Sequence, residues 1–84
     1  MADPLNVKTG KRLTQREIRV LDGMARGLTD AQISREVEVK PSTIHTYRAR
    51  IRLKLGAVNA PHAVALGFTK GYLRLLPRAV DHVR

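Results

Sequence analysis

The chain has 84 residues, a length that suits one domain with a small hydrophobic core. It holds 16 Lys and Arg against 7 Asp and Glu, a formal net charge of +9 that indicates a polyanionic partner such as DNA, RNA or an anionic membrane. The absence of cysteine excludes disulfides and thiolate metal sites. Because no apolar run approaches the roughly 20 residues of a membrane span and the N-terminus lacks the apolar stretch of a signal peptide, we expect a cytoplasmic protein without a membrane partner.

The charges are unevenly distributed along the chain. No acid occurs from Val39 to Val80, whereas five of the seven acids lie between Glu17 and Glu38. A one-sided layout of this kind is typical of a nucleic-acid binder. On charge alone, an ordinary solvated basic surface explains it equally well.

The two ends of the chain are expected to lie outside the domain proper. Residues 1–12 are predicted to form a flexible basic arm, because Pro4 and Gly10 oppose regular structure and the segment ends in Lys11 and Arg12. Residues 13–73 are predicted to form the domain. Residues 74–84 are predicted to be a C-terminal extension that forms one more turn or frays.

The first helix is predicted to begin after Thr14. The segment Thr14–Glu17 is typical of a capping box, in which the Thr14 hydroxyl accepts from the Glu17 amide and the Glu17 carboxylate accepts in return. Gly27 is a typical residue for the end of this helix. Apolar residues at helical spacing predict its buried stripe: Ile18, Leu21, Met24, Ala25 and Leu28.

Two closely spaced helices follow. A second capping box at Thr29–Gln32 starts a short helix, which ends where Lys40 precedes Pro41, because a residue before proline is pushed out of the helical region. Pro41 fits the first position of a third helix, and nothing interrupts that helix before Gly56. A short helix, a turn and a longer helix have the order and lengths of a helix-turn-helix unit.

The third helix is predicted to have two opposed faces. Its inward stripe is apolar at intervals of three and four residues: Ile44, Tyr47, Ile51 and Leu55. The opposite face carries small hydrogen-bonding side chains that suit contacts with base edges, and the expected base-reading residues are Ser42, Thr43, His45, Thr46 and Ala49.

Cations lie on and beside the third helix and at the end of the arm. As phosphate contacts we expect Lys11, Arg12, Lys40, Arg48, Arg50, Arg52 and Lys54. Taken without the helix-turn-helix context, the cations of residues 48–54 are equally well explained as an ordinary solvated helix face.

A fourth helix is predicted between Asn59, a plausible cap, and Gly71, after which Tyr72 folds back. One of its faces is built from small residues: Ala60, Ala63, Val64 and Gly67. This face suits either helix packing within the monomer or a seam between two copies.

Taken together, these features resemble the LuxR-type, or GerE-like, helix-turn-helix DNA-binding domain. The resemblance runs from Leu13 to about Leu73. It is carried by an ordered set of fragments at the right spacings: Leu13-Thr14-Gln15-Arg16-Glu17, Val20-Leu21, Ala25-Arg26-Gly27-Leu28-Thr29, Ile33-Ser34, Thr43-Ile44, Ile51, Lys54-Leu55-Gly56, Asn59, Ala63-Val64 and Gly71-Tyr72-Leu73.

The resemblance implies an all-α, four-helix domain in a sequence-specific transcriptional regulator of double-stranded DNA. It implies that the third helix, about residues 41–55, reads the major groove, and that the fourth helix forms a homodimer contact, at least on DNA. It therefore favours the seam interpretation of Ala60, Ala63, Val64 and Gly67. Many family members append this domain to a sensor or receiver domain, and this chain looks like the stand-alone kind or an excised domain.

The sequence departs from the family pattern at four positions. Lys40 stands where a serine-like cap is usual, and lysine cannot accept helix N–H bonds. His45 replaces a usual lysine, which alters one standard DNA contact. Tyr47 replaces a usual histidine and Ala60 a usual arginine, which affects the dimer geometry and the polar contacts between helices.

Other functions fit less well. A sigma-region-4-like promoter-binding module shares the first motif but not the fourth helix, and a protein-binding adaptor, docking for instance on RNA polymerase, does not need an acid-free third helix. His45, His62 and His82 stand too far apart for a local metal motif, and Ser34 and Ser42 have no catalytic base nearby in sequence. We therefore expect no enzyme activity, no metal and no cofactor.

Overall fold

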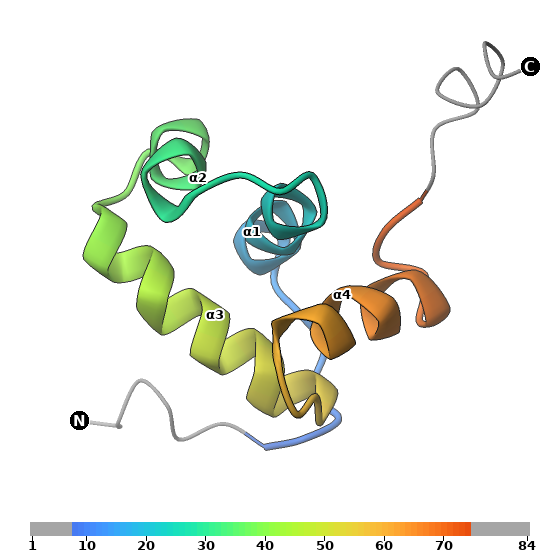
Figure 1. Ribbon diagram of the computed structural model, residues 1–84. Coiled ribbons are helices and arrows are strands. Elements are labelled where there is room, and N and C mark those ends of the chain that lie inside the picture. Colours follow the sequence, from blue (N-terminus) through green and yellow to red (C-terminus); the bar gives the residue numbers. More distant parts are fainter. Residues whose placement is uncertain (1–7, 75–84) are drawn as a thin grey trace, which may run out of the picture.

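The computed structural model describes residues 8–74, which form four α-helices joined by short connections (Figure 1). The helices are α1 Gln15–Ala25, α2 Asp30–Val37, α3 Pro41–Leu55 and α4 Ala60–Thr69. No strand occurs among these residues, and the all-α helix-turn-helix prediction is confirmed. Residues 1–7 of the expected arm and residues 75–84 of the expected extension lie outside the described residues.

The helices begin at the predicted capping residues. Thr14 Oγ1 accepts from the Glu17 amide at 3.1 Å, while the Thr14 amide donates to Glu17 Oε1 at 2.8 Å. The second capping box, at Thr29, has the same geometry, and Asn59 Oδ1 accepts from the His62 amide at 2.9 Å. These side chains satisfy amides that the first turn of a helix leaves without partners, which fixes where each helix starts.

The turn between α2 and α3 contains a feature that the sequence pattern did not predict. Glu38, the C-cap of α2, has the left-handed backbone angles φ 62° and ψ 48°. A residue with a Cβ atom pays roughly 1–2 kcal/mol for this conformation. The turn therefore stores strain, and packing of α2 and α3 on the core holds it in place.

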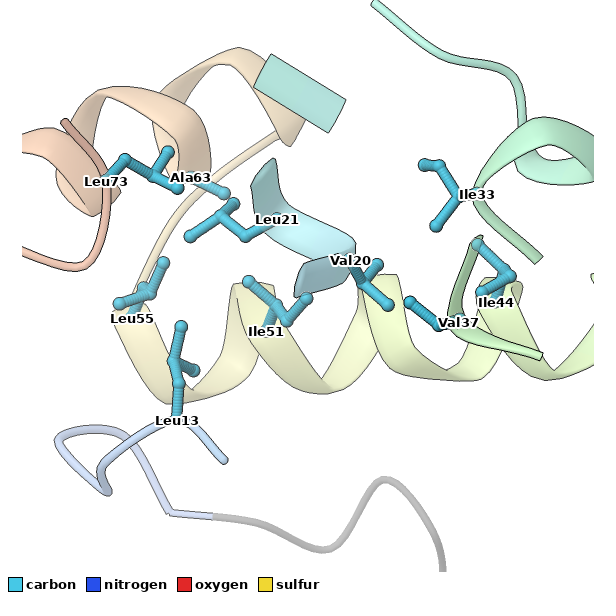
Figure 2. Packing of buried hydrophobic residues seen from close by; sticks show 10 residues of the cluster. All are labelled: Leu13, Val20, Leu21, Ile33, Val37, Ile44, Ile51, Leu55, Ala63 and Leu73. Carbon is cyan, nitrogen blue, oxygen red and sulfur yellow. The ribbon is translucent and has the colours of Figure 1, made fainter. Parts of the chain in front are cut away.

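The hydrophobic core lies where α1 packs against the other three helices. Figure 2 shows Val20 and Leu21 of α1 facing Ile51 of α3, with Ile33 and Val37 of α2 at one end of the cluster. The predicted inward stripe of α3 is confirmed: Ile44, Tyr47, Ile51 and Leu55 are buried or half-buried.

The predicted buried stripe of α1 is partly wrong. Val20 is fully buried although it was not part of that stripe, and Ala25, which was, is exposed. The reason is Glu17, a carboxylate that is itself fully buried beside Val20 and Leu21. An acid in the first turn of the inward face breaks the apolar pattern by which such a face is found in a sequence.

The predicted dimer seam on α4 is also wrong for two of its residues. Ala63 is fully buried in the monomer, and Gly67 lies so close to the core that a Cβ atom there would stand 2.8 Å from Leu21 Cδ2. The small side chains let α4 approach α1 of the same chain, not a second copy. Ala60 and Val64 are half-buried in the same monomer.

The two ends of the described segment are tied to the helices and to each other. The Thr9 hydroxyl donates to the Leu53 carbonyl at 3.0 Å, and the Gly10 amide donates to the Lys54 carbonyl at 2.7 Å, so the end of the arm caps α3. The Leu13 amide donates to the Tyr72 hydroxyl at 3.2 Å. Tyr72 folds back on α4 as predicted, because its amide donates to the Gly67 carbonyl.

Candidate nucleic-acid interface

The outer face of α3 carries the predicted base-reading residues. Ser42 and His45 are exposed near the start of the helix, and Thr43, Thr46 and Ala49 are half-buried. None of the 15 residues of α3 is an acid. Lys40, at the N-cap, makes no side-chain cap, and the Thr43 amide donates to the Lys40 carbonyl at 2.9 Å instead. The positive end of the α3 dipole therefore has no acceptor side chain of Lys40 to offset it.

A cleft of about 610 Å³ adjoins this face. It lies where α3 meets the end of α1 and the starts of α2 and α4, and it is lined by Met24, Asp30, His45, Arg48, Ala49, Arg52 and Ala60. The cleft therefore joins two predicted base-reading residues to two predicted phosphate contacts. Asp30 is the one acid in its lining.

The predicted phosphate contacts fall into different environments. Lys40 and Arg52 are exposed, and neither forms an ion pair within residues 8–74. Lys11 and Arg12 are also exposed, but they belong to the segment that caps the C-terminal end of α3. They therefore lie at the opposite end of α3 from Ser42 and His45.

Lys54 was expected to contact phosphate, and that prediction is wrong. Its side chain is only 8% exposed, and Nζ lies 2.8 Å from Glu17 Oε1 and 3.3 Å from the Arg12 carbonyl. Lys54 stands between Ile51 and Leu55 on the inward side of α3, where a cation requires a buried partner. Glu17 supplies that partner across 37 residues of sequence.

Arg50 approaches the same carboxylate from the rim of the core. Its Nε lies 3.4 Å from Glu17 Oε2, too poorly aligned for a hydrogen bond, and both atoms are buried. The side chain as a whole is 32% exposed. Glu17 thus faces two cations of α3 while its Oε1 also accepts from the Thr14 amide.

Arg48 lies on the other side of α3, toward α2. Its Nη1 donates to Asp30 Oδ1 at 2.7 Å, and the two side chains are 35% and 37% exposed. Arg48 was expected to offer its charge to phosphate, and the structure instead pairs it with an acid at the wall of the cleft.

A separate surface cluster joins α1 to α2. Arg26 donates to Asp22 and to both carboxylate oxygens of Glu36, while Arg19 donates to the Glu36 carbonyl. The hydrogen bonds from Arg26 hold the pKa of Glu36 below its ordinary value, and Glu36 in turn raises the pKa of Arg26. These contacts lie outside the cleft.

Within residues 8–74, no three His, Cys, Asp or Glu side chains are grouped closely enough to hold a metal ion. His82 lies outside the described residues. The hydroxyl of Ser34 donates to the Ala31 carbonyl of its own helix. In the same part of the chain, no helix is long and apolar enough to cross a membrane.

A short α2, a tight turn and a cation-flanked α3 also occur in a known protein family, as comparison with known proteins shows. Residues 11–66 match the family described as bacterial regulatory proteins, luxR family. The chain belongs to this family. The match covers all of α1, α2 and α3 and most of α4.

Curated relatives of this luxR-family chain are regulators. The transcriptional regulatory protein FixJ of Bradyrhizobium diazoefficiens is 36% identical over 61 residues, 73% of this chain and 30% of FixJ. The transcriptional regulatory protein UhpA of Escherichia coli K12 is 38% identical over 47 residues, 56% of this chain and 24% of UhpA. The chain thus spans less than a third of the length of either relative.

Two solved structures share the fold. A structure of VqmA bound to DPO superposes with a TM-score of 0.67 at 27% identity, over 83% of this chain and 35% of that one. A phage VqmA–DPO complex gives a TM-score of 0.65 at 35% identity, over 95% of this chain and 34% of that one.

Proposed function

We propose that this chain acts as a sequence-specific transcriptional regulator of double-stranded DNA, with α3 in the major groove. The observation that carries the proposal is the outer face of α3, which is free of acids, presents Ser42 and His45 to solvent, and has arginines on both flanks. The names of FixJ and UhpA as transcriptional regulatory proteins support it.

Base reading is assigned to the first half of α3. In helix-turn-helix proteins this half meets the base edges, and hydroxyl and imidazole groups can both donate and accept there. Ser42, Thr43, His45 and Thr46 share this half of the helix, and Ala49 lies just past its midpoint. Lys40 and Arg52, which are exposed and without ion pairs within residues 8–74, are the proposed phosphate contacts beside them.

A second copy is proposed to bind beside the first on DNA. With Ala63 and Gly67 inside the monomer, the side of α4 open to a partner is the one that carries Ala65 and Phe68, both exposed. Two-fold pairing would place the half-sites about 10 bp apart. Ala65→Glu should then abolish paired binding in sedimentation experiments with selected DNA while leaving the helical content unchanged.

The test of the proposed function is selection of bound duplexes from random DNA, followed by binding measurements at several salt concentrations. Each phosphate contact contributes about −0.9 to the slope of log K against log salt, so the contacts of Lys40 and Arg52 together give roughly −2 per monomer. His45→Ala and Thr46→Ala should cost about 1–3 kcal/mol on the selected site and less on random DNA. Arg52→Ala should weaken both alike.

Two outcomes would contradict the proposal. Affinity that barely changes with salt would exclude phosphate contacts as its source. Selection that enriches no sequence would exclude sequence-specific reading by α3.

A further inference from the structure

We propose that Asp30 is a specificity-determining residue, because its carboxylate holds Arg48 as a neutral pair and so withholds this arginine from the phosphate backbone. The inference rests on the proposed function and concerns the same surface. Its starting point is that the lining of the cleft beside the reading face contains one acid, and that this acid is paired with a cation of α3.

The geometry of the pair supports this role. Asp30 is the first residue of α2, and Arg48 lies in the middle of α3, one turn after His45. The 2.7 Å hydrogen bond therefore spans the cleft wall from one helix of the helix-turn-helix unit to the other. Both side chains remain about one-third exposed, so solvent and a ligand can reach the pair.

The charge of the pair decides what a phosphate would meet there. A phosphate oxygen that binds Arg48 must displace the Asp30 carboxylate from it. The displaced carboxylate then stays close to the phosphate and repels it, because both are negatively charged. Arg52, in the same cleft, has no such partner within residues 8–74. The two arginines thus line the same cleft, but the charge of Arg52 is available to a phosphate and the charge of Arg48 is neutralised by Asp30.

This difference bears on specificity because affinity for random DNA is almost entirely electrostatic. Every cationic side chain that is not neutralised by an acid and lies near the DNA raises the affinity for any DNA sequence. Contacts of His45 and Thr46 with bases depend instead on the sequence. By neutralising Arg48, Asp30 lowers the affinity for DNA of any sequence and leaves the base contacts of His45 and Thr46 in place. The ratio of the affinity for the selected site to the affinity for random DNA therefore rises.

The experiment measures binding of the full chain to the selected duplex and to a random duplex at several salt concentrations. Asp30→Asn should raise affinity for random DNA about twofold to fivefold at low salt, the range expected from the measured strength of exposed ion pairs. The slope of log K against log salt should steepen by about 0.9, one additional phosphate contact. Affinity for the selected site should rise less, because base contacts already fix the position of α3.

Two matched variants separate this effect from a change in net charge. Asp22→Asn changes the net charge by the same amount and removes one of the ion-pair partners of Arg26. Because Arg26 lies outside the cleft, the salt slope of this variant should equal that of the unmodified chain. In an Arg48→Gln background, Asp30→Asn should no longer steepen the slope. Circular dichroism confirms that each variant is folded.

Two results would overturn the inference. One is an Asp30→Asn slope that equals that of Asp22→Asn. The other is a loss of affinity for the selected site alone, which would make Asp30 a residue that aims Arg48 at a base. If the unmodified chain itself binds no duplex in a salt-dependent way, the proposed function fails as well, and this outcome is recognised before any variant is made.

Discussion

The two flanks of α3 carry similar contacts in opposite surroundings. Toward α1, Lys54 Nζ lies 2.8 Å from Glu17 Oε1, and both side chains are buried. Toward α2, Arg48 Nη1 lies 2.7 Å from Asp30 Oδ1, and both side chains are partly exposed. Since the distances are nearly equal, burial decides what the loss of one partner costs, and the two pairs differ in their roles for this reason.

The difference in burial between these two pairs gives the two flanks of α3 different roles, one in the stability of the domain and the other in the recognition of DNA. A buried charge that loses its partner has no water to replace it, so the Glu17 flank ties α3 to α1 and fixes its position. A partly exposed charge that loses its partner is simply solvated, so the Asp30 flank can change its charge without unfolding the domain.

The largest expected effect is that of Glu17→Gln. The substitution preserves the shape of the side chain but leaves Lys54 buried without a counter-charge, and it should cost about 3–5 kcal/mol of unfolding free energy. For a small domain of about 5–10 kcal/mol total stability, the variant should be barely folded in urea titrations followed by circular dichroism. A loss below about 1 kcal/mol would show that Glu17 and Lys54 are effectively solvated.

Removal of both charges should cost less than removal of one. Glu17→Leu combined with Lys54→Met removes both charges of the buried pair. Arg50, whose side chain is 32% exposed, loses its acid and Thr14 loses its capping partner, so the expected loss is about 1–3 kcal/mol. The measurement is the same urea titration, with Glu17→Gln as the reference. A double variant that is less stable than that reference would contradict the buried-pair explanation.

In the turn between α2 and α3, Glu38→Gly should stabilise the domain. Glycine adopts the left-handed angles of this position without the cost that a Cβ atom brings, and part of the gain is offset by its greater freedom in the unfolded chain. The expected gain is about 0.5–1 kcal/mol in thermal and urea unfolding. Glu38→Ala is the matched control, because it removes the carboxylate but retains the Cβ atom and should bring no gain.

On the exposed flank, Asp30→Asn should reduce stability by only about 0.2–1 kcal/mol at low salt. The loss should shrink further as salt is added, since ions screen partly exposed pairs. Unfolding midpoints measured at two ionic strengths check this expectation. A loss as large as that of Glu17→Gln would remove the distinction between the two flanks.

The smallest expected effect concerns pH and the surface cluster of Glu36 and Arg26. Because the pKa of Glu36 is lowered in the folded protein, its contribution to stability is present above its ordinary value of 4.5 and is lost as the pH falls through the lower folded value. Glu36→Gln should therefore bring a small loss of stability at pH 7 that disappears in strong acid. A loss that persists unchanged at low pH would point to packing, not charge.

The helices and their caps could be predicted from the sequence because the signals are local. Thr14 and Glu17 meet within a single turn, as do Thr29 and Gln32, so each start is encoded within four residues. The inward stripe of α3 was equally accessible, because Ile44 and Ile51 repeat at the helical period.

The partners of the charged residues could not be predicted in this way. Lys54 and Glu17 stand 37 residues apart, and Arg48 and Asp30 stand 18 apart, so their contacts depend on how the helices pack. A signal for Lys54 was nevertheless present, because its place between Ile51 and Leu55 puts it on the inward side. The general expectation that lysine is exposed outweighed it.

The small residues of α4 show a second limit. Ala63 and Gly67 allow close approach of any helix, and the sequence pattern does not say whether that helix belongs to the same chain. The side of α4 that faces α1 is settled only by the core that Leu21 and Leu73 build against it.

The hydrogen bond from the Leu13 amide to the Tyr72 hydroxyl has a consequence for the order of folding. It joins residues 59 apart in the sequence, whereas the capping boxes join residues three apart. Closing a long loop costs more chain entropy than closing a turn. We therefore expect the helix starts to form early in folding, and the Leu13–Tyr72 hydrogen bond to form after α1 and α4 have packed together. This hydrogen bond joins residues outside the four helices, so the Leu13 amide should exchange its hydrogen sooner than the amides of the core helices.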